Sequence, residues 1–110
     1  LNTFNSPHIP KVIFRNNGDL IYMSRAPVPS NKKRLLIKAW RQVCIYSFPY
    51  KSLKVFSNFK KKTTLEEIED LELNRFIEIG HKVKMIKLSN KSISVDTKDD
   101  LKKVRKLIKR

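Results

Sequence analysis

The chain is poor in the residues that build disulfide-bonded or metal-bound scaffolds. Its 110 residues include one cysteine, two glycines and two histidines. A single thiol excludes a disulfide framework within the chain, so Cys44 is expected to be a small buried hydrophobe in a reducing, cytoplasmic compartment. His8 and His81 do not form a metal-binding pair. No apolar run reaches the roughly 18 residues of a membrane span, so a soluble protein is expected.

Acidic residues are scarce as well, and several sequence motifs are absent. Ten Asp and Glu residues stand against 25 Lys and Arg residues, which gives a formal net charge of +15. Such a charge favours phosphate-bearing partners, and a non-enzymatic module that binds nucleic acid is one hypothesis. The lysines are spread along the chain, however, and the three basic clusters lack interleaved aromatic residues: 31–34, 60–62 and 102–110. No repeat, P-loop, nucleophile elbow or dinucleotide fingerprint occurs.

A hairpin is the clearest local prediction. Residues 11–15 and 20–23 alternate as strands, and residues 16–19 between them contain the Asn-Gly pair that favours a tight β-turn. Residues 24–29 contain two prolines, which remove ladder donors and fix φ. We therefore expect an antiparallel hairpin followed by a loop that carries Arg25.

Further regular segments follow in the rest of the chain. Residues 40–48 predict a buried strand, and residues 50–59 predict a short helix after Pro49. A second helix is expected over residues 65–79, and the alternating residues 81–88 and 92–95 predict two more strands. Helices and strands in this order indicate a mixed α/β fold.

The helix over residues 65–79 has well-marked ends. Thr64 and Glu67 match a capping box, and Gly80 is a helix stop. Half of the ten acidic residues lie in this helix, within seven positions: Glu66, Glu67, Glu69, Asp70 and Glu72. Acids are favourable near a helix N-terminus, so this grouping alone has an ordinary explanation.

One face of the same helix carries charges of both signs. Glu69, Glu72 and Arg75 are spaced by three residues, so a continuous helix places them on one face. They either form a surface ladder of ion pairs or meet a polar ligand, and the ladder is the simpler interpretation.

A carboxylate near the C-terminus is not explained by local structure. Thr97 caps a helix that begins there, and Asp100 reaches back to it, which leaves Asp96 without a structural role. Asp96 ends the strand predicted over residues 92–95, and strand ends in open α/β sheets are where sites form. Asp96 is therefore a candidate metal or substrate ligand.

Four segments in this order resemble the C-terminal half of 3-deoxy-manno-octulosonate cytidylyltransferase, the CMP-Kdo synthetase family: residues 22–29 (YMSRAPVP), 41–46 (RQVCIY), 65–75 (LEEIEDLELNR) and 95–101 (VDTKDDL). The resemblance runs from about Pro7 to Arg105. It implies one α/β nucleotidyltransferase domain about twice this length, with a nucleotide-diphospho-sugar transferase-like (Rossmann-like) mixed sheet and a β-hairpin that helps to form a homodimer. On this view residues 1–110 are the C-terminal part of that domain.

The family resemblance also implies a reaction. Members of the family join CTP and 3-deoxy-D-manno-octulosonate (Kdo) to give CMP-Kdo and diphosphate, for lipopolysaccharide biosynthesis. Asp96 would be the later of two aspartates that hold Mg²⁺, an ion that prefers hard carboxylate oxygens. Arg25 would bind the carboxylate of the sugar acid. The remaining implied contacts to the sugar are Gln42, Tyr46, Glu69 and Glu72, with Glu66 and Arg75 as lesser contacts or supports.

Two departures from the family pattern limit this interpretation. Many members have a histidine where Gln42 stands, and glutamine lacks the titratable proton, so a related acid such as an 8-amino analogue or a nonulosonate is an alternative substrate. The nucleotide loop, cytidine pocket and first Mg²⁺ aspartate have no counterpart here, and the sequence begins at Leu1 without Met. We therefore expect a fragment that is inactive alone and leaves a sheet edge and apolar surface uncovered.

Overall fold

The centre of the fold is a small antiparallel sheet. The computed structural model describes residues 2–89, 93 and 95–108. The strands of the sheet are β1 (Lys11–Phe14), β2 (Leu20–Ser24) and β3 (Trp40–Arg41), in the order β2-β1-β3. Five helices complete the described part of the chain: α1 (Asn2–Asn5), α2 (Tyr50–Asn58), α3 (Thr64–Glu69), α4 (Leu73–Glu78) and α5 (Lys98–Ile108). The predicted α/β class is confirmed, and the strands of the described residues are all antiparallel.

The predicted hairpin is present. β1 pairs with β2 so that Val12 faces Met23 and Lys11 faces Ser24. Gly18 turns the chain with φ +91°, and a Cβ atom there would lie 3.1 Å from the carbonyl oxygen of Met85. Both the backbone angle and the close approach favour glycine, because it has no Cβ.

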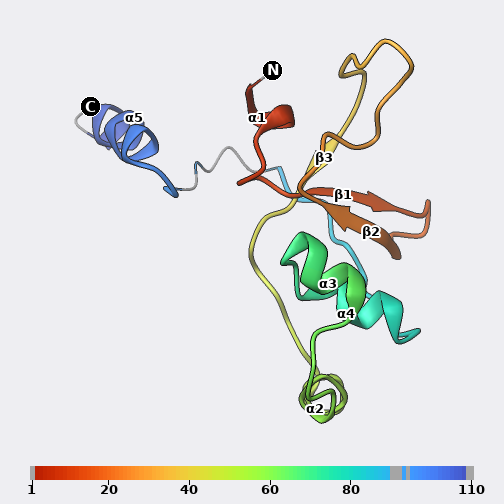
Figure 1. Ribbon diagram of the computed structural model, residues 1–110. Helices are drawn as coiled ribbons and strands as arrows, with labels where there is room; N and C mark the ends of the chain where they lie inside the picture. Colours follow the sequence, from red (N-terminus) through yellow and green to blue (C-terminus); the bar gives the residue numbers. More distant parts are fainter. Residues whose placement is uncertain (1, 90–92, 94, 109–110) are drawn as a thin grey trace.

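The core lies between this hairpin and the segment that contains α4. Val12, Leu20 and Met23 of the hairpin contact Leu71, Leu73 and Phe76. Burial of one such side chain contributes about 1.5–3 kcal/mol. Figure 1 shows α3 and α4 lying together against the β2 side of the sheet.

The single helix predicted over residues 65–79 is wrong. α3 ends at Glu69, and Asp70 adopts a left-handed conformation with φ 52° and ψ 50° before α4 begins at Leu73. The capping box is also shifted by one residue, to Thr63 and Glu66. Gly80 does terminate the second helix, with φ +82°, and the N–H groups of Gly80 and His81 donate to the carbonyl oxygens of Ile77 and Phe76 as in a Schellman motif.

The outer edge of β2 is contacted at Met23 and at Leu20. The side-chain amide of Asn74 pairs with both backbone groups of Met23: the Met23 N–H donates to Oδ1 at 3.2 Å, and Nδ2 donates to the Met23 carbonyl at 2.9 Å. Nearer the turn, the Leu20 N–H donates to Val83 O at 2.8 Å. A side-chain amide and a loop thus replace the missing strand, which protects an edge that would otherwise be open.

Several predicted strands are shorter than expected or absent. The strand predicted over residues 40–48 contains only the two residues of β3, and Cys44 is exposed, not buried. The strand predicted over residues 81–88 is reduced to one bridge between Asp19 and Lys84. Of residues 92–95, the described ones, Ile93 and Val95, are not in a strand, and the others lie outside the described residues.

The predicted helices at Tyr50 and after Thr97 are confirmed as α2 and α5. Thr97 and Asp100 cap α5 reciprocally: the Thr97 N–H donates to the Asp100 carboxylate at 3.0 Å, and the Asp100 N–H donates to Thr97 Oγ1 at 3.2 Å. Figure 1 shows α5 standing apart from the sheet and from α3. Among the described residues, none of these helices is long and apolar enough to cross a membrane.

Candidate functional site

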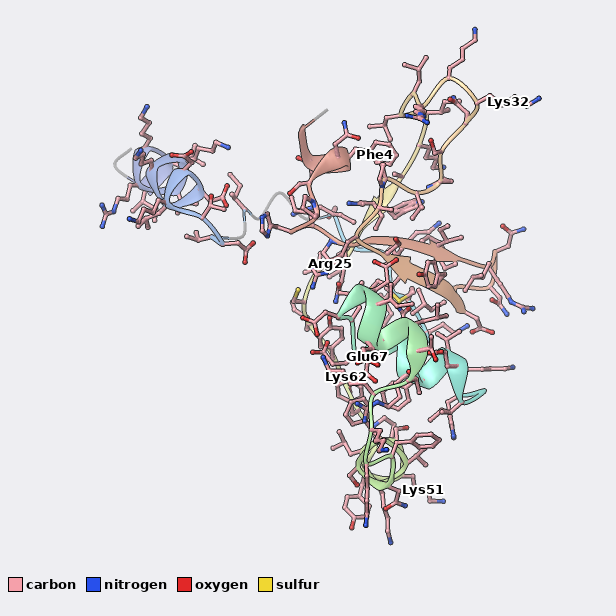
Figure 2. All side chains as sticks on the ribbon, in the orientation of Figure 1. Phe4, Arg25, Lys32, Lys51, Lys62 and Glu67 are labelled. Carbon is pink, nitrogen blue, oxygen red and sulfur yellow. The ribbon has the colours of Figure 1, made fainter. Side chains whose placement is uncertain are left out.

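Arg25 joins the loop after β2 to the C-terminal end of α3. Its Nε donates to Glu69 O at 2.6 Å, Nη2 to Asp70 O at 3.0 Å, and Nη1 to Pro7 O at 2.9 Å. A cation is favourable at a helix C-terminus, where carbonyl groups lack intrahelical partners. Figure 2 shows Arg25 between the hairpin and α3. These three bonds use three of the five N–H donors of a guanidinium and leave two for another acceptor.

The side chain of Glu69 binds the end of β2 and the first residue of the loop that follows it. Oε1 accepts hydrogen bonds from Tyr22 Oη at 2.8 Å and Ser24 Oγ at 2.6 Å, and Oε2 accepts the Arg25 N–H at 2.8 Å. Burial raises the pKa of Glu69, but these hydrogen bonds outweigh burial and hold the pKa below its ordinary value. Burial and the bond to Glu69 raise the pKa of Tyr22 to about 12, so its hydroxyl remains a donor.

The lowered pKa of Glu69 predicts a pH dependence of folding. The folded state binds fewer protons at Glu69 than the unfolded state near pH 4, so the contribution of this carboxylate is complete above its ordinary pKa of 4.5. The contribution is lost as the pH falls through the lowered folded pKa. Urea unfolding should show that the wild-type chain loses more stability between about pH 5 and pH 3 than Glu69→Gln does. Equal pH profiles would contradict the assignment.

Arg75 and Glu66 form a buried ion pair that the sequence spacing did not predict. Arg75 Nε donates to Glu66 Oε2 at 2.6 Å, and Nη2 donates to Glu66 Oε1 at 2.7 Å. Arg75 Nη1 also donates to the carbonyls of Phe56 and Phe59, at 3.2 and 3.3 Å, and the guanidinium lies 3.8 Å from the ring centroid of Phe56. Glu66 and Arg75 are buried and bind each other, and they join α2 to α3 and α4.

The helix break therefore separates residues that a continuous helix would align. Glu69 turns toward the loop of Arg25, and Arg75 turns toward Glu66, so the surface ladder of Glu69, Glu72 and Arg75 is wrong. Burial raises the pKa of Glu66, but the bond from Arg75 and the Thr63 N–H outweigh it and lower the pKa overall.

Tyr46 is influenced by the charge of Glu72, the residue directly before α4. Burial is the main cause that raises the pKa of Tyr46 to about 12, and the interactions with Cys44 and Glu72 add to it. The Tyr46 ring contacts Phe48 at a centroid distance of 5.8 Å, and Phe48 stacks on Phe76 at the same distance. Tyr46 is thereby connected to the core, while Glu72 is exposed at the start of α4.

The last two candidates occupy different environments. Gln42 is buried directly after β3, and its backbone N–H donates to Pro10 O at 2.9 Å. Its side-chain Oε1 has no hydrogen-bond partner among the described residues. A buried unpaired acceptor is uncommon, because leaving it unpaired costs about 1–3 kcal/mol. Asp96 is exposed, and it precedes α5, which stands apart from α3 and α4 (Figure 1).

Sequence reasoning missed three residues of the Arg25 network. Lys11 is 2% exposed, and its Nζ donates to Ser6 O at 2.8 Å and Arg25 O at 2.7 Å. Tyr22 and Ser24 supply the hydroxyls on Glu69. The hairpin register could have indicated this group, because Lys11 and Ser24 are cross-strand neighbours.

Comparison with known proteins defines the class. The cytidylyltransferase family model matches residues 3–93, and the chain belongs to this family. The relatives that it matches include the mitochondrial 3-deoxy-manno-octulosonate cytidylyltransferase of Arabidopsis thaliana, 36% identical in an alignment of 106 residues that covers 94% of this chain and 36% of that protein. The 3-deoxy-manno-octulosonate cytidylyltransferase of Chlorobaculum tepidum is 31% identical over 104 residues, which are 94% of this chain and 42% of that protein.

A solved structure agrees with the family. The structure of CMP:2-keto-3-deoxy-manno-octonic acid synthetase complexed with CTP superposes with a TM-score of 0.81 at 26% identity, over 96% of this chain and 44% of that chain. The chain thus spans about two fifths of the length of the curated relatives it matches.

Proposed function

We propose that the chain supplies the sugar-acid-binding part of a cytidylyltransferase that converts CTP and Kdo to CMP-Kdo and diphosphate. The observation that carries the proposal is the match to the cytidylyltransferase family over residues 3–93. The names of the matched relatives support Kdo as the acceptor. We further propose that the 110 residues alone do not catalyse the reaction, since they span about two fifths of such enzymes.

Arg25 is the proposed contact to the carboxylate of the sugar acid. Its three bonds to backbone carbonyls fix the guanidinium plane, and two N–H donors remain for an incoming carboxylate. Glu69, which the sequence proposed as a sugar contact, supports this arrangement by holding the Arg25 N–H and the Tyr22 and Ser24 hydroxyls. Fixing a cation before the ligand arrives reduces the entropy lost on binding.

Gln42, Tyr46 and Glu72 are the proposed contacts to sugar hydroxyls. The Gln42 Oε1 atom accepts no hydrogen bond from the described residues, so a ligand donor would satisfy it. Tyr46 keeps its hydroxyl proton at neutral pH and can donate, and Glu72 can accept. Glu66 and Arg75 are proposed as supports, because their charged groups are buried against each other.

Asp96 is the proposed metal ligand. An exposed carboxylate suits Mg²⁺, which is often held by one or two carboxylates together with substrate phosphates. The described residues contain no group of three or more His, Cys, Asp or Glu side chains that could hold a metal ion, so Asp96 would be one ligand among others from elsewhere. When bound, the ion would polarise the α-phosphate of CTP and activate the sugar hydroxyl.

Gln42 also favours a second candidate substrate. Its unpaired amide oxygen can accept a hydrogen bond from a hydroxyl or from an ammonium group, so an amino-substituted 2-keto acid is an alternative acceptor. Competition between Kdo, its 8-amino analogue and a nonulosonate would identify the acid that is consumed.

Diphosphate release tests the proposed function. The chain, with CTP, Kdo and Mg²⁺, should release no diphosphate alone. The chain joined to the part of the Chlorobaculum tepidum enzyme that lies outside their match should release diphosphate only when both CTP and Kdo are present. Release by the chain alone would overturn the proposed inactivity, and a folded combined protein that is inactive with all three acids would overturn the proposed reaction.

A further inference from the structure

The chain between β2 and β3 carries positive charge without acidic residues. No Asp or Glu occurs in the sequence between Asp19 and Glu66. Within this stretch the basic loop, residues 31–38, has four exposed cationic side chains: Lys32, Lys33, Arg34 and Lys38. In the part of the chain that the structure describes, none of the four forms an ion pair. These charges are therefore available to an anionic partner.

The basic loop also exposes apolar side chains beside its charges. Ile37 is 82% exposed and Leu35 is 57% exposed, whereas Leu36 between them is less exposed and lines a small cavity with Phe4 and Trp40. Figure 1 shows the chain between β2 and β3 projecting beyond the sheet, away from α2, α3 and α4. Exposed apolar residues grouped with cations on a projecting loop indicate a surface that binds a partner.

Hydrogen bonds within the basic loop fix the shape of its tip. The Arg34 N–H donates to Asn31 O at 2.9 Å, and the Leu35 N–H donates to Asn31 Oδ1 at 3.1 Å. Just beyond the loop, the Trp40 ring contacts Phe14 at a centroid distance of 5.6 Å. A loop with a fixed turn and a base packed on the sheet loses less entropy when it binds.

We propose that the basic loop docks the protein on an anionic lipid surface, where Leu35 and Ile37 enter the interfacial layer and the cations meet lipid phosphate groups. Clustered Lys and Arg residues are attracted to the negative potential of such a surface, and apolar side chains add to binding by their burial. A nucleic acid would also bind the cations, but its phosphate backbone offers no apolar layer to Leu35 and Ile37. The inference does not depend on the proposed reaction.

Trp40 provides a signal for docking, because it is the only tryptophan of the chain. Lys38 Nζ lies 5.7 Å from its ring centroid, so the emission should respond when the basic loop binds. The chain is mixed with vesicles of phosphatidylcholine and phosphatidylglycerol in equal parts, or with vesicles of phosphatidylcholine alone. We expect co-sedimentation and a change of Trp40 emission with the anionic vesicles only. No binding to the anionic vesicles, or equal binding to both kinds, would overturn the proposal.

The same sedimentation applies to the chain joined to the part of the Chlorobaculum tepidum enzyme that lies outside their match. This protein should also bind the anionic vesicles. Loss of binding would show that the added part covers the basic loop, and would overturn the proposal. Diphosphate release is assayed separately, so a protein that binds vesicles but is inactive would contradict only the proposed function.

Charge variants test the cations of the basic loop. Lys32→Gln with Lys33→Gln removes two charges and should weaken binding to the anionic vesicles by about 10-fold or more. Lys51→Gln with Lys54→Gln removes the same charge from exposed positions of α2 and should weaken binding by less than about 3-fold. Equal losses in the two double variants would show that only net charge matters and would contradict docking by the basic loop.

A second pair of variants tests the apolar contact. Ile37→Asp should weaken vesicle binding by at least about 10-fold, since a charged side chain cannot enter the apolar layer. Ile86→Asp changes an isoleucine that is 79% exposed in another segment and should have little effect. Circular dichroism checks that both variants fold. Equal effects of the two variants, tighter binding to a single-stranded oligonucleotide than to vesicles, or self-association that Ile37→Asp abolishes would each overturn the proposal.

Discussion

Arg75→Met should destabilise the chain by about 3–5 kcal/mol, because it leaves Glu66 buried without its charge partner. Glu66 accepts both short bonds from Arg75, and the same guanidinium holds the C-terminal end of α2 through two carbonyls. A loss of this size is a large part of the stability of a small domain. Urea unfolding followed by circular dichroism gives the free energy of unfolding.

Two comparisons make this measurement specific. The double variant Glu66→Met with Arg75→Met removes both charges and should recover much of the loss, since an apolar pair of similar volume is often as stable as a buried ion pair. Lys102→Met removes a partner of Asp99 from an exposed pair at 3.2 Å and should change stability by less than about 0.5 kcal/mol. A loss below about 1 kcal/mol in Arg75→Met would contradict the assigned role.

Asp96→Asn should lower kcat/KM by about 100-fold or more, measured in the chain joined to the part of the Chlorobaculum tepidum enzyme that lies outside their match. Removing a residue that hydrogen-bonds to a metal ligand typically lowers metal affinity or activity by about 10–100-fold. Removing the charge of the ligand itself should lower activity at least as much. Asparagine keeps an oxygen at this position, and raising the Mg²⁺ concentration should therefore restore part of the activity. Initial rates of diphosphate release over a Mg²⁺ titration provide both values.

Asp99→Asn is the matched control for Asp96. Asp99 is an exposed carboxylate three residues away in α5, and its contact is an exposed lysine. This variant should keep at least half of the wild-type kcat/KM. If Asp96→Asn retained the same activity as Asp99→Asn, Asp96 would not be a metal ligand.

Local signals in the sequence predicted the elements that depend on local structure. The Asn-Gly pair predicted the hairpin, Gly80 predicted the end of α4, and Thr97 with Asp100 predicted the start of α5. Each of these features is formed by residues a few positions apart. Backbone geometry and short-range hydrogen bonds therefore suffice to determine them.

Long-range contacts decided the features that were predicted wrongly. Arg25 binds the carbonyls of Glu69 and Asp70, so α3 ends where periodicity predicted a continuous helix. Once the helix is broken, Ile68 becomes 73% exposed although it fits the apolar spacing, and Arg75 pairs with Glu66. Spacing rules describe residues a few positions apart and cannot predict a contact between residues 25 and 69. The sequence therefore identified the candidate residues but did not predict how they are arranged.

Lys11 has a consequence for chemical labelling. Burial lowers the pKa of its amine although the charge of Glu69 acts in the opposite direction, and the backbone carbonyls of Ser6 and Arg25 accept hydrogen bonds from Nζ. Amine acylation requires an accessible, unprotonated nitrogen, and Lys11 becomes accessible when its bonds to Ser6 O and Arg25 O break and the segments that carry them move away. In a chain with many exposed lysines, acylation of Lys11 therefore reports the local opening of the N-terminal segment and the release of the Arg25 loop.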